Sequence, residues 1–250
     1  MKRIASWIGW MALSTTMALA QRSVVEDASA EQSLLTWSNP VGWEAGLAYV
    51  HVTRSVDLEG LETRLKADIA DVEIGMMPWP WLLVYGRAGG SQAQLTEVAG
   101  DDSSPGGGGG IGMRLNLWQI YEGVQATAWR FTLQMAGQYM YRTTQDDGDG
   151  EVQWGEALVW MPFNYHLSFA RPFRNSYMAE FQSLAVYAGP AFSKVDGTWT
   201  RRGAEQDFEE EDNFGAVYGA QFWLLENLSF EARAEWFENT TLQLMVHYRF

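Results

Sequence analysis

The stretch that decides the fold is WRFTLQMAGQYMYR, residues 129–142. Its odd-numbered positions carry mostly large apolar or aromatic side chains, and its even-numbered positions are mostly polar. Successive side chains of a β-strand point to opposite faces, so a period of two predicts a strand with one apolar and one polar face. The end of the chain, 240–250, has the same alternation. These two segments predict an all-β protein.

The pattern extends over the chain from residue 42 onward. We predict ten strands, at about 42–55, 60–76, 81–98, 109–119, 124–143, 151–163, 181–196, 213–224, 228–236 and 240–250. The segment 163–180 is the weakest, and either extends the sixth strand or connects it to the seventh. Eight or twelve strands therefore remain alternatives to ten. We see no internal repeat and no domain boundary within 42–250.

The connections between these strands alternate in length. Those after the second, fourth and eighth strands are tight, whereas those after the third, fifth and seventh are longer and polar. The longer ones include a glycine run at 106–110, interpreted as a flexible loop, and an acidic run at 207–212, interpreted as a solvated loop. Short turns at one end and long loops at the other are typical of an outer-membrane β-barrel.

Composition excludes several classes of protein. The 250 residues contain no cysteine, which excludes disulfide scaffolds, thiolate metal sites and cysteine nucleophiles. There are 17 Lys and Arg against 31 Asp and Glu, and the net charge of −14 argues against a nucleic-acid partner, which requires a basic face. The hydrophobic content of 47% is too high for a disordered chain.

The first twenty residues have the layout of a secretory signal peptide. Lys2 and Arg3 precede a mostly apolar run, and Ala18-Leu19-Ala20 is a small-x-small cleavage site. We therefore predict a signal peptide at 1–20, a periplasmic N-terminal segment at 21–41 and a barrel domain at 42–250. The predicted location is the bacterial outer membrane.

Charges on single strand faces favour a membrane barrel over a soluble one, because a membrane barrel is apolar outside and polar inside. On this reading charged side chains fill the lumen and pair with one another. The predicted lumen charges are Glu62, Arg64, Lys66, Asp68, Arg114, Arg130, Arg142, Glu231, Arg233 and Glu235. Aromatic residues near strand ends, Trp154 and Trp199 among them, are predicted to form the interfacial girdles of such a barrel.

The last strand carries a resemblance to a known family. Leu244, Val246, Tyr248 and Phe250 alternate up to the chain end, with an aromatic residue last and another two positions earlier. This ending resembles the C-terminal signal of Gram-negative outer-membrane barrel proteins, which implies recognition by the barrel-assembly machinery. In size and pattern the mature chain is similar to the superfamily of OmpA- and OmpX-like barrels. The resemblance implies a closed antiparallel up-and-down transmembrane β-barrel of about ten strands, and it brings no catalytic motif.

The functional expectation is a non-enzymatic barrel with a charged, largely filled lumen. Its role would be structural or in surface interaction, or the narrow passage of small solutes or ions. The expected surroundings are outer-membrane lipid and lipopolysaccharide, and no catalytic residue, cofactor or metal site is predicted. Two alternatives stay open: a rim enzyme acting on lipids or peptides, and a soluble periplasmic ligand-binding barrel. For the enzyme, His51 is the histidine nearest the outer rim, with Ser55 or Asp57 within reach.

Overall fold

The structure is a computed structural model, and it describes residues 42–96, 104–124, 127–145, 151–173, 181–201, 203–224 and 227–250. The predicted signal peptide and N-terminal segment lie outside these residues. In the described part of the chain no helix is long and apolar enough to cross a membrane.

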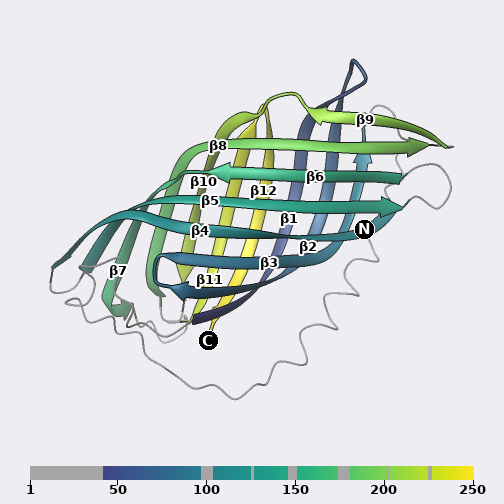
Figure 1. Cartoon of the computed structure of the whole chain (residues 1–250). Helices are drawn as coiled ribbons and strands as arrows, with labels where there is room; N and C mark the ends of the chain where they lie inside the picture. The colour runs from purple at the N-terminus through teal and green to yellow at the C-terminus, as the bar shows by residue number, and fades with distance from the viewer. Residues whose placement is uncertain are drawn as a thin grey trace.

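The described residues form one antiparallel sheet of twelve strands (Figure 1). The strands are β1 Gly42–Leu58, β2 Leu61–Trp79, β3 Leu82–Leu95, β4 Ser104–Val124, β5 Thr127–Gln145, β6 Glu151–Trp160, β7 Phe163–Phe173, β8 Phe181–Arg201, β9 Ala204–Glu210, β10 Phe214–Trp223, β11 Leu228–Phe237 and β12 Asn239–Arg249.

The sheet closes on itself because β1 pairs with both β2 and β12. Twelve strands fill ten positions in the wall, since two positions are each shared by a broken strand. β6 and β7 both lie between β5 and β8, and the break falls at Met161 and Pro162. Proline has no backbone N–H, so it interrupts the ladder of hydrogen bonds there. The prediction of a closed ten-strand barrel is confirmed, and 163–173 continues the sixth strand.

The second broken position changes the barrel along its axis. β10 pairs with β8 and β11, whereas β9 continues beside β8 and then pairs with β1 through Val56–Glu210 and Leu58–Phe208. β9 thus passes over the ends of β10, β11 and β12, which are short (Figure 1). At this end, called the β9 end below, the described residues form a ring of β1, β2, β3, β4, β5, β6, β8 and β9. The opposite end, where β1 begins and β12 ends, is called the terminal end.

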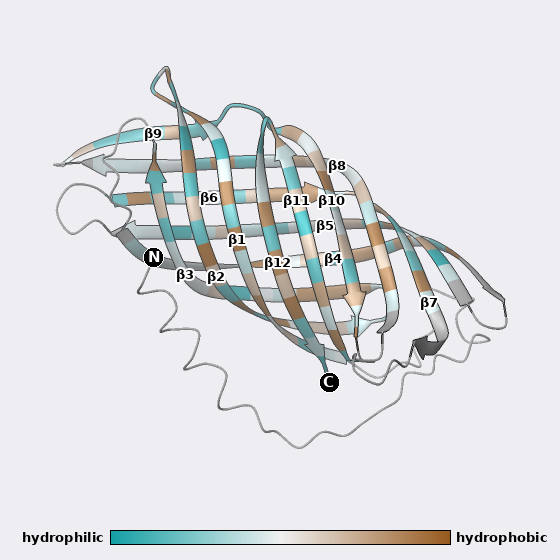
Figure 2. Ribbon diagram, turned by 180° about the vertical axis from the view of Figure 1, so that it is seen from behind, coloured by the Kyte–Doolittle hydropathy of each residue, from teal (hydrophilic) through white to brown (hydrophobic). Residues whose placement is uncertain are grey.

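The outer wall of the barrel is apolar over most of its height. Alternate residues of the strands point outward, and many of them are large, apolar and exposed; Leu47 is 57% exposed, Ile74 59% and Ile111 70%. Figure 2 shows this alternation as brown and teal segments along β1 and β12. The opposite faces point into the barrel and carry buried charges such as Arg54 and Glu235. A soluble barrel has the reverse arrangement, so the structure confirms the transmembrane type of barrel.

Three predicted local features are wrong. The glycine run at 106–110 is part of β4 and not a loop, and it pairs with β3 and β5. The acidic run begins inside β9 and not in a solvated loop, and Glu210 is buried. Trp154 and Trp199 do not belong to an outer girdle, because they point inward and are 2% and 5% exposed. The corrections for the acidic run and for the two tryptophans have one cause. At the β9 end the strands continue the barrel wall, and the interior there is apolar.

Candidate functional site

The charged lumen is the candidate site, and it is built from the inward faces of nearly all the strands. Because side chains alternate, every second residue of a strand enters the lumen. Most strands contribute one or two ionisable groups there between small or apolar inward neighbours. On β1, for example, Arg54 lies between Val52 and Val56 on the inward face, and all three side chains are buried.

Next to the β9 end, Arg54 is the centre of a cluster of carboxylates. Its Nη2 donates to Glu235 Oε2 at 2.8 Å and lies 3.4 Å from Glu156 Oε1. Its Nε lies 3.4 Å from Glu210 Oε1. The Arg54 side chain is fully buried, and its guanidinium lies over the ring of Phe237, 4.3 Å from the centroid. One arginine therefore holds together carboxylates from β6, β9 and β11.

In the middle of the barrel two further arginines pair with carboxylates of β2. Arg142 donates to both oxygens of Asp71, at 3.1 and 2.5 Å. Arg87 Nε donates to Glu73 Oε2 at 2.5 Å. Gly108 makes room for Arg142, since a Cβ at Gly108 would lie 2.8 Å from Arg142 Cγ. These are buried ion pairs, which cost desolvation on both sides but are strongly destabilised when one partner is removed.

The wall opposite these pairs carries charges on β11. Arg233 Nη2 lies 2.8 Å from Glu235 Oε1, and its guanidinium lies over the ring of Trp160. Glu231 accepts a hydrogen bond of 2.5 Å from the Tyr187 hydroxyl. Glu235 thereby joins Arg233 to the Arg54 cluster.

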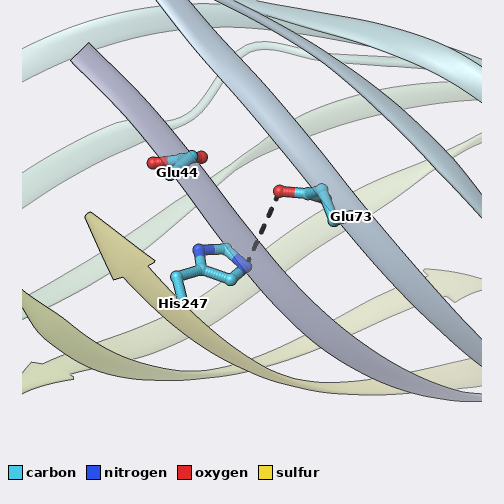
Figure 3. Close-up of side chains that lie close together, drawn as sticks. All are labelled: Glu44, Glu73 and His247. Carbon is cyan, nitrogen blue, oxygen red and sulfur yellow. Dashed lines mark ion pairs between the residues drawn. The ribbon is translucent and has the colours of Figure 1, made fainter. Parts of the chain in front are cut away.

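Near the terminal end three potential metal-binding side chains come together. Glu44 of β1, Glu73 of β2 and His247 of β12 are buried, and one ligand atom of each lies within 4.8 Å of the others. Figure 3 shows the imidazole turned toward Glu73, with His247 Nε2 3.8 Å from Glu73 Oε1. An imidazole with two carboxylates is a donor set that first-row transition metals accept.

A cavity of about 20 Å³ lies inside the network, lined by Asp71, Arg142, Glu235 and Gln243 among other residues. A buried cavity needs roughly 10–15 Å³ to hold one water molecule, so this one has room for about one. Thr241 also lines it, and its Oγ1 has no hydrogen-bond partner. The cavity is far too small for a hydrated ion or a sugar.

Beyond the charges, an apolar core fills the barrel at the β9 end. Its buried residues come from β1, β2, β3, β6, β8 and β9. They are Val52, Val56, Leu58, Leu65, Ala67, Ile69, Ala93, Leu95, Val152, Trp154, Val195, Trp199 and Phe208. Phe208 is 2% exposed, so β9 closes the wall and also adds a side chain to the core.

Glu210 lies at the border between this core and the Arg54 cluster. Burial raises the pKa of its carboxyl to about 7, and the charge of Arg54 limits this rise. Its side chain is 2% exposed, so Glu210 is a buried acid whose pKa is raised mainly by its burial.

The structure divides the predicted lumen charges into two groups. Six lie on inward faces, namely Arg114, Arg130, Arg142, Glu231, Arg233 and Glu235. For Glu62, Arg64, Lys66 and Asp68 the prediction is wrong, because these residues lie on the outer wall and are exposed or half-exposed. The inward face of this part of β2 is apolar, with Leu65, Ala67 and Ile69 in the core. Charges on the outer wall are stable there because this part of β2 belongs to the β9 end, beyond the apolar belt.

Sequence reasoning missed several lumen charges. They are Glu44, Arg54, Asp71, Glu73, Arg87, Glu156 and Glu210. Of these residues only Arg87 is the single charge of its strand, whereas β1, β2, β6 and β9 each carry further charges. For Arg87 the signal that could have found it is the lone charge itself, because an isolated charge in a barrel with an apolar outer wall has to point inward.

The histidines occupy different environments. His51 lies on the outer wall, and its Nδ1 is 2.9 Å from Asp68 Oδ1 on the neighbouring strand. The same Asp68 oxygen accepts a 2.7 Å hydrogen bond from the Tyr49 hydroxyl. Ser55, predicted to be within reach of His51, instead accepts a hydrogen bond of 2.6 Å from Asn239 Nδ2. The partner of His51 is therefore a carboxylate and not a nucleophile.

The residues of the predicted assembly signal share the outer face of β12. Leu244 is 59% and Phe250 65% exposed, and the ring centroids of Tyr248 and Phe250 are 5.1 Å apart. Phe250 is held at the barrel rim by a hydrogen bond from its backbone N–H to the carbonyl oxygen of Trp43. The signal is thus an exposed apolar stripe at the edge where β12 meets β1.

No protein-family model and no curated protein matches the chain. Among solved structures, an outer membrane channel from Pseudomonas putida F1 is similar at 12% identity and a TM-score of 0.36, over 85% of this chain and 97% of that one. The translocator domain of the autotransporter NalP from Neisseria meningitidis is similar at 10% identity and a TM-score of 0.34, over 87% and 91%. Ail, the attachment invasion locus protein of Yersinia pestis, is similar at 10% identity and a TM-score of 0.23, over 84% and 97%.

The Pseudomonas protein is an outer membrane channel by name, and likeness at such scores assigns neither a role nor a site residue to this chain. The chain's own geometry defines it more closely: it is a closed antiparallel β-barrel of ten strand positions, apolar outside, whose lumen is filled by a network of buried ion pairs and by an apolar core at the β9 end.

Proposed function

We propose that this protein is a non-enzymatic outer-membrane barrel that does not conduct solutes and that acts as a structural element or through its outer, β9-end surface. In this proposal the signal peptide directs export, and the barrel-assembly machinery inserts the chain into outer-membrane lipid and lipopolysaccharide. The terminal end then faces the periplasm, because both the start of β1 and the end of β12 lie there.

The observation that carries the proposal is the double closure of the lumen. A solute entering from the terminal end meets the ion pairs Arg87–Glu73 and Arg142–Asp71 and then the Arg54 cluster. Beyond these it meets the apolar core with Trp154, Trp199 and Phe208. Opening a path through the charged layer would leave buried charges without partners, at a cost of several kcal/mol each. Opening the apolar core would expose buried apolar side chains to water.

Planar-bilayer recording tests the proposal. The refolded full-length protein is reconstituted, with its folded state checked by its electrophoretic mobility before and after boiling, and a general porin serves as the positive control. We expect no discrete conductance steps from this protein under conditions in which the porin conducts. Reproducible steps that scale with the amount of folded protein would contradict it.

A second candidate, a narrow path for water, is favoured by the cavity of about 20 Å³ inside the network. The cavity accommodates about one water molecule, and its polar lining provides hydrogen-bond partners. Osmotic shrinkage of proteoliposomes in a stopped-flow instrument distinguishes the two candidates. Faster shrinkage than in empty vesicles, with no ion conductance, would support the water path over the fully closed barrel.

A further inference from the structure

We propose that Glu44, Glu73 and His247 form a binding site for one divalent transition-metal ion, of the Zn²⁺ or Co²⁺ type, at the terminal end of the lumen. Nothing in the sequence predicts this site, because its members come from β1, β2 and β12 and lie far apart in the chain. The proposal does not depend on whether the lumen conducts.

The strand register brings the three donors to one patch of the inner wall. Gly46 of β1 pairs with Glu73 on one side and with His247 on the other, so these two residues flank it. Glu44 lies two positions before Gly46 and therefore points to the same side of the sheet. All three side chains are 6% exposed or less.

Two glycines leave space for the donors. A Cβ at Gly46 would lie 2.7 Å from His247 Cδ2, and a Cβ at Gly75, the β2 partner of Glu44, would lie 2.9 Å from Glu44 Cγ. Any larger residue at either position would displace the imidazole or the carboxylate. The patch is therefore a recess whose floor is glycine, with the Leu83 side chain also beside Gly75.

The donor set and its spacing fit a transition metal better than Ca²⁺ or Mg²⁺. The hard cations prefer oxygen ligands alone, whereas an imidazole with carboxylates suits zinc and cobalt. His247 Nε2 and Glu73 Oε1 are 3.8 Å apart, too far for a hydrogen bond between them. With metal–ligand bonds of about 2.0–2.2 Å, an ion between the donors requires a closure of roughly 1 Å, which a small side-chain rotation provides.

Neighbouring arginines orient the two carboxylates. Arg87 donates to Glu73 Oε2, which leaves Glu73 Oε1 directed toward His247. Arg249 Nε lies 3.4 Å from Glu44 Oε2. Outer-shell partners of this kind fix ligand geometry at metal sites in general. Glu231, which is 5% exposed, interacts electrostatically with Arg114, His247 and Arg233, and Arg114 also faces Glu44.

An ion would reach this recess from the terminal end. Glu44 is the third residue of β1, so at about 3.3 Å per residue the site lies within roughly 10 Å of the rim. The Arg249 side chain at the rim is 44% exposed and covers Glu44. The Arg249 guanidinium also lies over the ring of Trp223, and the path from the β9 end is blocked by the apolar core.

Equilibrium dialysis of the refolded, tag-free, chelator-treated full chain against Zn²⁺, followed by metal analysis, tests the site. Co²⁺ is used in parallel because its visible absorption reports nitrogen and oxygen coordination. We expect one ion per chain, and at least a tenfold loss of affinity in each of the variants His247→Ala and Glu44→Gln. The matched control is His51→Ala, which removes a histidine of the outer wall and should bind as the unchanged protein does.

Each variant is first shown to be folded by its heat-dependent mobility, and if His247→Ala does not fold, His247→Gln replaces it. The proposal is overturned if the unchanged protein shows no saturable binding. It is also overturned if folded His247 and Glu44 variants bind as well as the unchanged protein, or if His51→Ala alone abolishes binding. In those cases the three side chains form only a buried ionic cluster.

Discussion

Arg54 Nη2 lies 2.8 Å from Glu235 Oε2, although 181 positions separate the two residues in the chain. Arg54 enters the lumen from β1 and Glu235 from β11, and β12 lies between these strands. The pair therefore forms only when the last strands of the barrel close against the first. The ion pair can therefore form only in the closed barrel, since no local segment contains both partners.

Removing Arg54 should strongly destabilise the barrel. The variant Arg54→Met keeps much of the side-chain volume but leaves Glu235, Glu156 and Glu210 without their shared cation. Loss of one member of a buried ion pair costs about 3–5 kcal/mol. Denaturant unfolding in detergent or lipid vesicles, followed by tryptophan fluorescence, measures the change. The control Arg64→Met removes an exposed arginine of the outer wall and should change the stability by less than about 0.5 kcal/mol.

The stability should depend on pH through Glu210. Burial raises the pKa of this carboxyl from 4.5 to about 7, so between these pH values the folded chain keeps a proton that the unfolded chain has lost. The contribution of Glu210 to stability is therefore unimpaired below pH 4.5, decreases as the pH rises, and is lowest above pH 7. The shift corresponds to about 3 kcal/mol at most. Measuring the free energy of unfolding of Glu210→Gln and of the unchanged protein at pH 5 and pH 8 isolates this contribution. The difference in free energy between the two proteins should change with pH, and a constant difference would refute the assignment.

A charge placed on the apolar outer wall should be costly in proportion to its depth. Leu47 is exposed on the outer face of β1, within the apolar belt. The variant Leu47→Arg should be less stable than the unchanged protein by about 2–4 kcal/mol in a lipid bilayer, because charged residues are destabilising by this amount near the midplane of membrane barrels. Thr53→Arg lies on the same face of β1, six residues nearer the β9 end, and should cost less than 1 kcal/mol. Equal costs at the two positions would show that the belt is not at bilayer depth.

Phe250 should matter for assembly more than for the stability of the folded barrel. Its ring is exposed on the outer face and contacts Tyr248, so Phe250→Ala removes little buried surface. If the end of β12 is read by the barrel-assembly machinery, this variant should lower the folded amount in the outer membrane several-fold. Phe230→Ala, on the outer face of the adjacent β11, is the control. A similar decrease in both variants would mean that the effect is not specific to the chain end.

The sequence allows the ten strand positions to be predicted, because a period of two survives along most of the long strands. The start of β4 is an exception, since its five glycines carry no alternation. It does not show which of two alternating faces points inward. For β2 the charged face was taken as the lumen, yet Glu62, Arg64, Lys66 and Asp68 lie outside. The reason is that this barrel extends beyond its apolar belt. There the outer wall meets water and the interior is apolar, so charge no longer marks the inside.

The ion pairs could not be predicted, since they depend on closure of the ring. Arg142 and Asp71 come from strands three positions apart in the wall, and Arg54 meets Glu210 only because β9 turns away from β10 to join β1. Pairing of β9 with β1 covers three residue pairs, which is too little for a sequence pattern to reveal. The metal-binding recess likewise results from the register that places Gly46 between Glu73 and His247.

The central claim is that this chain is a barrel with an apolar outside and a polar, closed lumen in the outer membrane. Electrophoresis of fractionated cells, with and without boiling, tests it most directly. We expect the protein in the outer-membrane fraction, resistant to detergent until boiled and then changed in mobility. Recovery in the soluble periplasmic fraction, with the same mobility before and after boiling, would contradict the account.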